Sequence, residues 1–414
     1  MKNNPAYHIC LLAVMVAGVL VVRAAAAPPA AATAFTGAYT AEMLSVASGG
    51  LQRGSVYRGL LEAVMDADLA RVVGAPVGTC LHASGLLPHG GDLSGSHLGD
   101  LQGASNLAAY DHPLLYELWL EGAFSDGRMI VRAGRLVADT DFAVTASGAS
   151  FLNSSFGWPA FISANTRNTG PAFARSALGV FAELQLTRTV RIQAGVYDGD
   201  TFDDAGGDPA RHPNGLRVSL SRDQGLFVVT EIILETEAGP AAARRPGSLR
   251  LGMWWHTADF AELATPARIH AGNHGVWLVA EQMLWRESGP GDESTVPQGL
   301  TAFVRIGRSP DDRNLLSHAA DAGLSYTGLI PGRDTDTLGL GVAWARVSAG
   351  ARRAERQVDA AVISDGEWVV ELTYGLALGD RWLLVPDLQY IRHPGGSAAV
   401  GDAWVVGLRT RVTF

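Results

Sequence analysis

The chain has 414 residues, of which 18% are charged and 49 are glycine, and its formal net charge is -9. Soluble domains average about 25% charged residues and about 7% glycine, so this chain is poor in charge and rich in glycine. Its 47% of hydrophobic residues excludes an intrinsically disordered protein. The acidic balance also excludes a nucleic-acid partner, which requires a concentrated positive surface.

The first 27 residues have the pattern of a secretory signal peptide. Lys2 precedes an apolar run at 9–22, and alanines follow at 24–27. The run is shorter than the roughly 20 residues that a membrane-spanning helix needs. We therefore predict an exported chain with a signal peptide at 1–27 and one mature domain at 28–414. Cys10 lies in the signal peptide, which leaves Cys80 without a partner for an intrachain disulfide.

Short stretches of alternating apolar and polar residues recur along the mature chain and end at Gly, Asp, Pro or Asn. Alternation of this period is typical of half-buried β-strands. The stretch 215–222 lies between turn-forming residues and is excluded, so we predict about sixteen strands. The predicted ranges include 57–69, 76–86, 113–122, 127–138, 178–186, 190–196, 225–236, 249–255, 274–286, 298–308, 318–328, 335–347, 367–378, 382–390 and 404–414.

The last stretch shows the pattern most clearly. An apolar face with Trp404 and Phe414 at its two ends opposes Arg409 and Arg411. A soluble β-sandwich would bury such faces between two sheets, whereas an outer-membrane barrel turns them toward lipid between aromatic girdles. The signal peptide, the aromatic strand ends and the long series of strands without a helical pattern favour the barrel. We predict an all-β, transmembrane antiparallel β-barrel in a single domain.

Four long connections are expected between the strands, at 84–112, 139–172, 198–214 and 257–273. Sixteen strands enclose a water-filled channel. One or more of these connections is expected to fold into the lumen and narrow it.

Eight sequence strings resemble those of the carbohydrate-selective porins of the OprB type, in the same order and across almost all of the mature chain. The strings are TGAYTAE at 36–42, GDLQGASN at 99–106, YELWLE at 116–121, FLNSSFG at 151–157, QAGVYDG at 193–199, LSYTGLIPGR at 324–333, the stretch 337–348, and PDLQYIRHPGG at 386–396. The resemblance implies a sixteen-stranded outer-membrane barrel that passes glucose and other sugars by facilitated diffusion. Gly122 and His393 depart from the family pattern and leave the range of sugars open.

A sugar channel needs inward side chains that exchange hydrogen bonds with hydroxyl groups, and flat side chains along which a sugar ring can slide. Glu117, Trp119, Arg128 and Arg132 lie on adjacent predicted strands at or near a matched string and are the preferred candidates. Most inward charges are expected simply to pair with one another. The full set of candidate pore-lining residues is Arg58, Glu62, Glu117, Trp119, Arg128, Arg132, Arg191, Arg250 and Arg305.

Other groups of reactive residues carry weaker patterns. His82, His89, His97 and His112 lack the tight spacing of a metal site. The acidic stretch at 198–208 departs from an EF-hand loop at Phe202 and Asp203, so we predict neither a metal nor a cofactor, while calcium in that stretch stays open. Ser154 and Ser155 are not part of a GxSxG motif, and we predict no catalytic residue.

The sequence leaves four functions to compare. The first is a passive porin for glucose and maltose-type sugars, located in the bacterial outer membrane. A general diffusion porin with a weak anion preference is the alternative, because arginines outnumber carboxylates among the expected inward residues. A barrel hydrolase or a soluble binding protein is disfavoured. The expected partners are sugars, outer-membrane lipid and the insertion machinery, which would read the terminal Phe414; both a monomer and a trimer fit the sequence.

Overall fold

The computed structural model describes residues 32–202, 211–236, 245–287, 298–359 and 365–414. The signal peptide predicted at 1–27 lies outside these residues and stays a prediction. Three short helices are described, α1 (Leu69–Val73), α2 (Ala160–Ser163) and α3 (Ala349–Val358). None of the described helices has the length and apolar character needed to cross a membrane.

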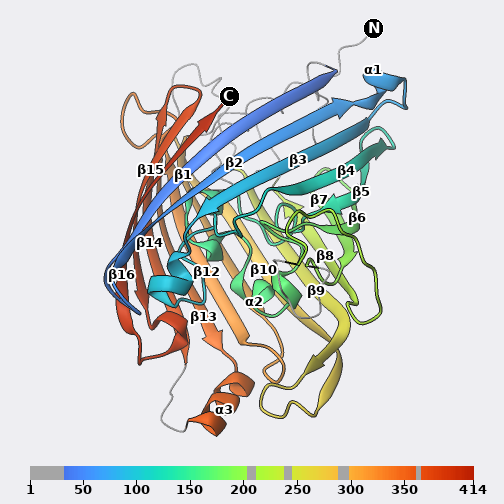
Figure 1. Cartoon of the computed structure of the whole chain (residues 1–414). Coiled ribbons are helices and arrows are strands. Elements are labelled where there is room, and N and C mark those ends of the chain that lie inside the picture. The colour runs from blue at the N-terminus through green and yellow to red at the C-terminus, as the bar shows by residue number, and fades with distance from the viewer. Residues whose placement is uncertain (1–31, 203–210, 237–244, 288–297, 360–364) are drawn as a thin grey trace.

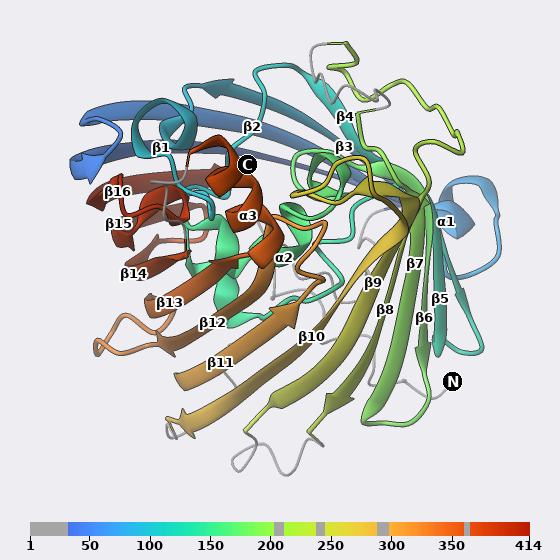
Figure 2. The same cartoon turned by 90° about the horizontal axis from the view of Figure 1, so that it is seen from below.

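Sixteen antiparallel strands pair in sequence order, and β1 pairs with β16 to close a barrel (Figures 1 and 2). The predicted fold and strand number are therefore confirmed, and residues 215–222 form no strand. The strands are β1 (Thr33–Gly50), β2 (Gly54–Asp68), β3 (Thr79–Gly90), β4 (Leu114–Phe124), β5 (Met129–Leu136), β6 (Ala177–Gln185), β7 (Val190–Asp198), β8 (Leu226–Glu235), β9 (Gly247–Ala261), β10 (Ile269–Arg286), β11 (Gly299–Arg308), β12 (Leu316–Thr327), β13 (Thr337–Val347), β14 (Gly366–Leu378), β15 (Trp382–Arg392) and β16 (Gly401–Thr413).

Alternation sorts the side chains of each strand between the two faces of the wall. On β9, Leu251 and Trp255 are 58% and 46% exposed, whereas their neighbours Trp254 and His256 are fully buried. The exposed face is thus apolar and the inner face carries the polar groups, the reverse of a soluble protein and the arrangement expected in lipid.

The prediction of a long connection at 257–273 is wrong, because β9 continues to Ala261 and β10 begins at Ile269. Thr257 and Asp259 occupy outward positions of this extension, next to the buried Ala258. The alternation rule expects an apolar outward face, and this extension has polar residues there, so the rule did not predict it as a strand. The strand pairing nevertheless continues through Asp259 and Phe260.

The two rims of the barrel differ. Connections of more than 20 residues, at 91–113, 137–176 and 199–225, leave the rim opposite the two chain ends. Barrels of this kind have short periplasmic turns and longer extracellular loops. The rim with the long connections is therefore the extracellular one.

Candidate functional site

Two extracellular connections turn into the barrel instead of extending away from it. They are the β3–β4 connection (91–113) and the β5–β6 connection (137–176), which includes α2 and lies inside the ring of strands in Figure 2. Phe142, Phe151, Phe156 and Phe161 of the second connection are all at most 1% exposed. Both connections therefore agree with the expectation that at least one long connection folds into the lumen.

Carboxylates on the inner wall hold the β5–β6 connection by its backbone. Glu231 of β8 accepts a hydrogen bond from the Ala143 N–H at 3.1 Å, and Glu281 of β10 accepts one from the Ala146 N–H at 2.9 Å. Glu371 of β14 accepts the Asn153 N–H at 3.0 Å. These hydrogen bonds tie the connection to β8, β10 and β14 and so fix its course.

Arg305 of β11 holds the same connection through its carbonyl groups. Its guanidinium donates to the carbonyl oxygens of Ala143 at 2.6 Å and Gly157 at 2.8 Å, and to that of Ser155. Its Nε is 2.9 Å from a carboxylate oxygen of Asp321. Arg305 is 1% exposed, and its described contacts are with the protein.

Glycines on the inner wall make room for the aromatic side chains of the connection. A Cβ at Gly341 of β13 would lie 2.6 Å from the ring of Phe156, and one at Gly307 of β11 would overlap the ring of Phe161. Neighbouring inward positions on β13 are also small, Gly339, Ala343 and Ala345. The high glycine content therefore has a structural cause at these sites, because the wall must accept a layer of protein within it.

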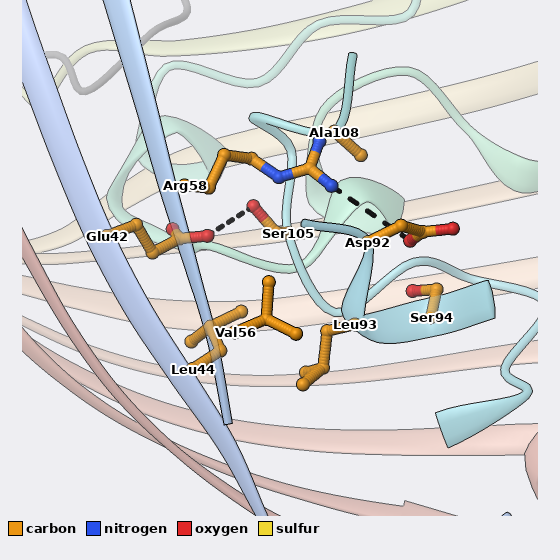
Figure 3. A pocket seen from close by; sticks show the side chains of 9 residues that line it. All are labelled: Glu42, Leu44, Val56, Arg58, Asp92, Leu93, Ser94, Ser105 and Ala108. Atoms are coloured by element: carbon orange, nitrogen blue, oxygen red, sulfur yellow. Dashed lines mark hydrogen bonds and ion pairs between the residues drawn. The ribbon is translucent and has the colours of Figure 1, made fainter. Parts of the chain in front are cut away.

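Side chains of β1 and β2 hold the β3–β4 connection. Glu42 of β1 accepts the Ser105 hydroxyl at 2.6 Å, and Arg58 of β2 donates to the Leu107 carbonyl at 3.2 Å while lying 4.0 Å from Asp92 (Figure 3). These polar contacts surround an apolar patch that contains Leu44 and Leu93. The guanidinium of Arg58 is thus used to position the connection.

The two connections also contact each other through the serines of the FLNSSFG string. The Ser155 hydroxyl donates to the Gln102 side chain at 2.8 Å, and the Ser154 hydroxyl donates to the Ser105 carbonyl at 3.0 Å. Both serine hydroxyls therefore join one connection to the other.

Three of the four preferred candidates lie together on the inner wall. The Trp119 indole N–H donates to Glu117 at 3.0 Å, and its ring stacks on His82 with the centroids 4.7 Å apart. The Arg132 guanidinium lies 5.6 Å from the Trp119 ring and 4.1 Å from that of Phe181. This cluster combines the flat surface and the charged groups that the sequence predicted, with Trp119 2% and Arg132 7% exposed.

Asp141 of the β5–β6 connection links this cluster to the next strands. Its carboxylate is 2.7 Å from the Arg132 guanidinium, and its carbonyl oxygen accepts the Gln193 side chain at 2.6 Å. Gln193 also donates to Glu231 at 2.9 Å, and Glu231 pairs with Arg250 at 3.1 Å. A continuous network of hydrogen bonds and ion pairs thus runs from β5 to β9.

Farther toward the periplasmic rim, the inner wall carries partly exposed ion pairs. Arg191 lies 2.9 Å from Glu235 and 3.6 Å from Glu183, and the Arg191 side chain is 22% exposed. Glu62 pairs with Arg411, and these side chains are 18% and 19% exposed. Each of these pairs offers donors and acceptors side by side.

Arg128 lies apart from the other candidates. It is exposed in the turn between β4 and β5 and donates to the Leu186 carbonyl at 3.2 Å. Contact with a sugar stays a prediction for all nine candidates.

One carboxyl group in the entering connection is buried without a cation beside it. Asp139 is 5% exposed, and its Oδ2 accepts the Phe173 N–H at 2.8 Å. Burial, and to a lesser degree the nearby Glu117 and Asp141 carboxylates, raises the pKa of Asp139 to about 7. This group therefore titrates near neutral pH.

Sequence reasoning missed the anchoring residues Glu231, Glu281 and Asp141. Glu231 and Glu281 could have been found, because they alternate with apolar residues on their strands. Asp141 had no such signal, since it lies outside a strand. No pattern in the sequence indicates which backbone groups the glutamates hold.

Among the described residues, no group of three or more His, Cys, Asp or Glu side chains is arranged to hold a metal. His82 is 2.6 Å from an Asp66 carboxylate oxygen, and His89 is 3.0 Å from the Tyr39 hydroxyl. In the acidic stretch at 198–208, Asp203, Asp204 and Asp208 lie outside the described residues.

The family model "Carbohydrate-selective porin, OprB family" matches residues 52–414. The chain belongs to this family. The expected resemblance is therefore confirmed, and the porin family and the barrel fold together indicate a channel rather than an enzyme, located in the bacterial outer membrane.

Similar proteins agree with this assignment. Porin B of Pseudomonas aeruginosa is 26% identical over 329 residues, which cover 72% of this chain and 68% of that protein. The putative porin QuiX of Acinetobacter baylyi is 25% identical over 49% of this chain and 48% of its own length.

The high-pH structure of Pseudomonas putida OprB has the same fold as this porin. It has a TM-score of 0.81 and 21% identity, and the match covers 92% of this chain and 94% of that one. Its low-pH structure matches with a TM-score of 0.56 and 17% identity, over 92% and 93% of the two chains.

Proposed function

We propose that this porin passes glucose and maltose-type sugars by passive diffusion, through a lumen narrowed by the β5–β6 connection. The observation that carries the proposal is the pairing of charges on the inner wall. Arg191 pairs with two glutamates, and Glu62 pairs with Arg411. Paired donors and acceptors match a neutral solute with many hydroxyl groups, because each hydroxyl both donates and accepts.

The same pairing argues against a general porin with an anion preference. That alternative rests on an excess of arginines, yet Arg132, Arg250, Arg305 and Arg409 each lie within 3.1 Å of a carboxylate oxygen. A compensated wall has little net field to select anions.

The aromatic cluster has a defined role in this proposal. Trp119, held by Glu117 and His82, forms a rigid section of wall beside Arg132 and the entering connection. A sugar would exchange hydrogen bonds with the more exposed charged groups of the wall, Arg191, Glu183 and Glu235. Selectivity would then arise from pore diameter and from the donors and acceptors of the wall.

Single-channel conductance in a planar bilayer tests the proposal. Glucose and maltose should reduce the current saturably, whereas an uncharged non-sugar polyol should reduce it only in proportion to viscosity. Equal effects of all three solutes would contradict sugar selectivity and favour a general porin.

Arg191→Gln tests the role of the compensated charges in the same bilayers. The substitution leaves Glu183 and Glu235 without their shared arginine, so the reversal potential in a salt gradient should shift toward cation selectivity. Arg268→Gln is the matched control, because Arg268 pairs with Glu262 on an extracellular hairpin and is 69% exposed. An unchanged reversal potential in Arg191→Gln would show that this pair does not face the permeation path.

A further inference from the structure

The outer surface of the barrel has a hollow at β2–β4. It measures about 430 Å³ and is lined mainly by apolar residues, among them Leu61, Leu87, Pro113, Leu115 and Leu216. Leu61 and Leu87 are 38% and 43% exposed on the face that an outer-membrane barrel turns toward lipid. A volume of this size lies in the range of small-molecule sites.

A segment of the β7–β8 connection forms one side of the hollow. The Asn214 carbonyl accepts the Leu115 N–H at 3.1 Å, at the start of β4, where β5 no longer pairs with it. Arg175, which is 5% exposed, donates to the carbonyls of His212 at 3.3 Å and Pro213 at 2.9 Å. These contacts fix the segment against the wall beside the extracellular rim.

Positive charge gathers beside the hollow. Arg135 of β5 pairs in register with Leu118 and Leu178, and Leu118 is an outward residue, so Arg135 also points outward. Its guanidinium donates to the Arg217 carbonyl at 3.2 Å. The Arg217 guanidinium in turn lies 2.8 Å from the His212 ring.

The outward arginine Arg135 lies near the extracellular surface of the membrane. An arginine on the lipid-facing side of a barrel is costly in the middle of the bilayer and tolerated near its surface, and Arg135 is the second-last residue of a strand that ends at the extracellular rim. The chain as a whole carries a net charge of -9. A local cationic group beside an apolar hollow therefore complements a ligand with a negative head and an apolar tail.

We propose that this surface binds a phosphorylated, acylated glycolipid of the outer leaflet, with one acyl chain in the hollow and a phosphate on Arg135 and Arg217. Segment 211–217 would be held more firmly against the wall by the bound lipid. The inference does not depend on which solutes the channel passes.

Native mass spectrometry of the full-length porin in detergent tests the site, with bisphosphorylated lipid A and its phosphate-free form as probes. We expect one tightly retained lipid A per barrel. The retained amount should fall about fivefold in Arg217→Ala, since an arginine at an anionic lipid surface contributes roughly that factor. The wild-type porin should retain the phosphate-free form at least about fivefold less than it retains bisphosphorylated lipid A.

Leu87→Trp tests the apolar part of the site, because a larger side chain fills the hollow. Leu340→Trp on β13 is its control, since Leu340 is 48% exposed on the outward face, away from this site. Arg268→Ala is the control for Arg217→Ala. Heat-modifiable migration and conductance verify that each variant folds.

Four results would overturn the proposal. Equal losses in Arg217→Ala and Arg268→Ala would indicate unspecific charge attraction, and equal losses in the two tryptophan variants would exclude an acyl chain in the hollow. Replacement of the lipid adduct by a dimer, abolished by Leu87→Trp, would assign the surface to a second copy of the chain. Displacement of lipid A by inorganic phosphate alone would reduce the site to an anion site.

Discussion

Buried charges in this porin act chiefly by fixing the course of the chain. Glu371 and Arg305 are both at most 1% exposed, and each binds backbone groups of the same connection. An ionic group buried in this way is retained only if its partners satisfy it, because an unpaired buried charge is costly. Loss of Glu371 or Arg305 would thus release part of the β5–β6 connection from the wall.

Asp139 makes the stability of the folded porin depend on pH. Its pKa is raised to about 7 in the folded protein, whereas an unfolded aspartate titrates near about 4. Between these values the folded state binds a proton that the unfolded state releases, so the free energy of unfolding falls as pH rises from about 4 to about 7.

Asp139→Asn should remove this part of the pH dependence. The variant keeps an acceptor for the Phe173 N–H and cannot ionise, so it should be more stable than the wild type at pH 8, by about 2–4 kcal/mol, and similar to it at pH 4. Urea midpoints across this pH range check the prediction. Asp380→Asn, at an exposed position, is the control. If the urea midpoints of Asp139→Asn and the wild type changed with pH in parallel, the prediction would be wrong.

Fifteen of the sixteen strands, β2 to β16, could be predicted from sequence because each contains its own signal, whereas β1 (Thr33–Gly50) is not among the predicted ranges. On β16, outward Leu408 is 48% exposed and the next residue, Arg409, is 3% exposed, as alternation requires. The signal failed at 257–261, where polar residues replace the apolar face.

The course of the entering connections could not be predicted in the same way. Glu371 and Asn153 are separated by 218 positions, and Arg305 and Ala143 by 162. These contacts depend on how sixteen strands close into a ring, which no local pattern encodes. The structure brings Glu117, Trp119 and Arg132 together because their strands are adjacent, but it places the fourth preferred candidate, Arg128, apart in a turn. The anchoring role of Arg305 became apparent only in three dimensions.

Gly341→Leu should displace the β5–β6 connection from the wall. The new side chain would overlap the ring of Phe156, and overpacking of this kind costs about 1–3 kcal/mol. We expect a lower urea midpoint together with a larger or more variable single-channel conductance. Its neighbour Leu340→Ala, on the outward face, should leave conductance unchanged, and a normal conductance in Gly341→Leu would show that the connection does not set the pore size.

The seam between β1 and β16 completes the barrel. Gly37 and Phe414 exchange two backbone hydrogen bonds of 2.9 Å, and a side chain at Gly37 would overlap the Phe414 ring. Phe414 is nevertheless 64% exposed. Its ring is thus accessible from outside while its backbone closes the sheet.

Deletion of Phe414 should lower the amount of folded porin in the outer membrane, because both the closing hydrogen bonds and the proposed recognition by the insertion machinery are lost. Phe414→Ala separates the two effects, since it keeps the backbone, and Phe414→Trp should restore insertion. Heat-modifiable porin in membrane fractions measures the yield. Normal insertion of Phe414→Ala would exclude recognition of the aromatic ring.

The even number of strands places both described ends of the chain at one rim (Figure 1). Removal or duplication of a single strand would send one end to the opposite side of the membrane and make the first and last strands parallel. Removal or duplication of a hairpin preserves both the sidedness and the antiparallel seam. The hairpin is therefore the smallest unit by which this architecture can grow or shrink, and changes in its circumference must come in steps of two strands.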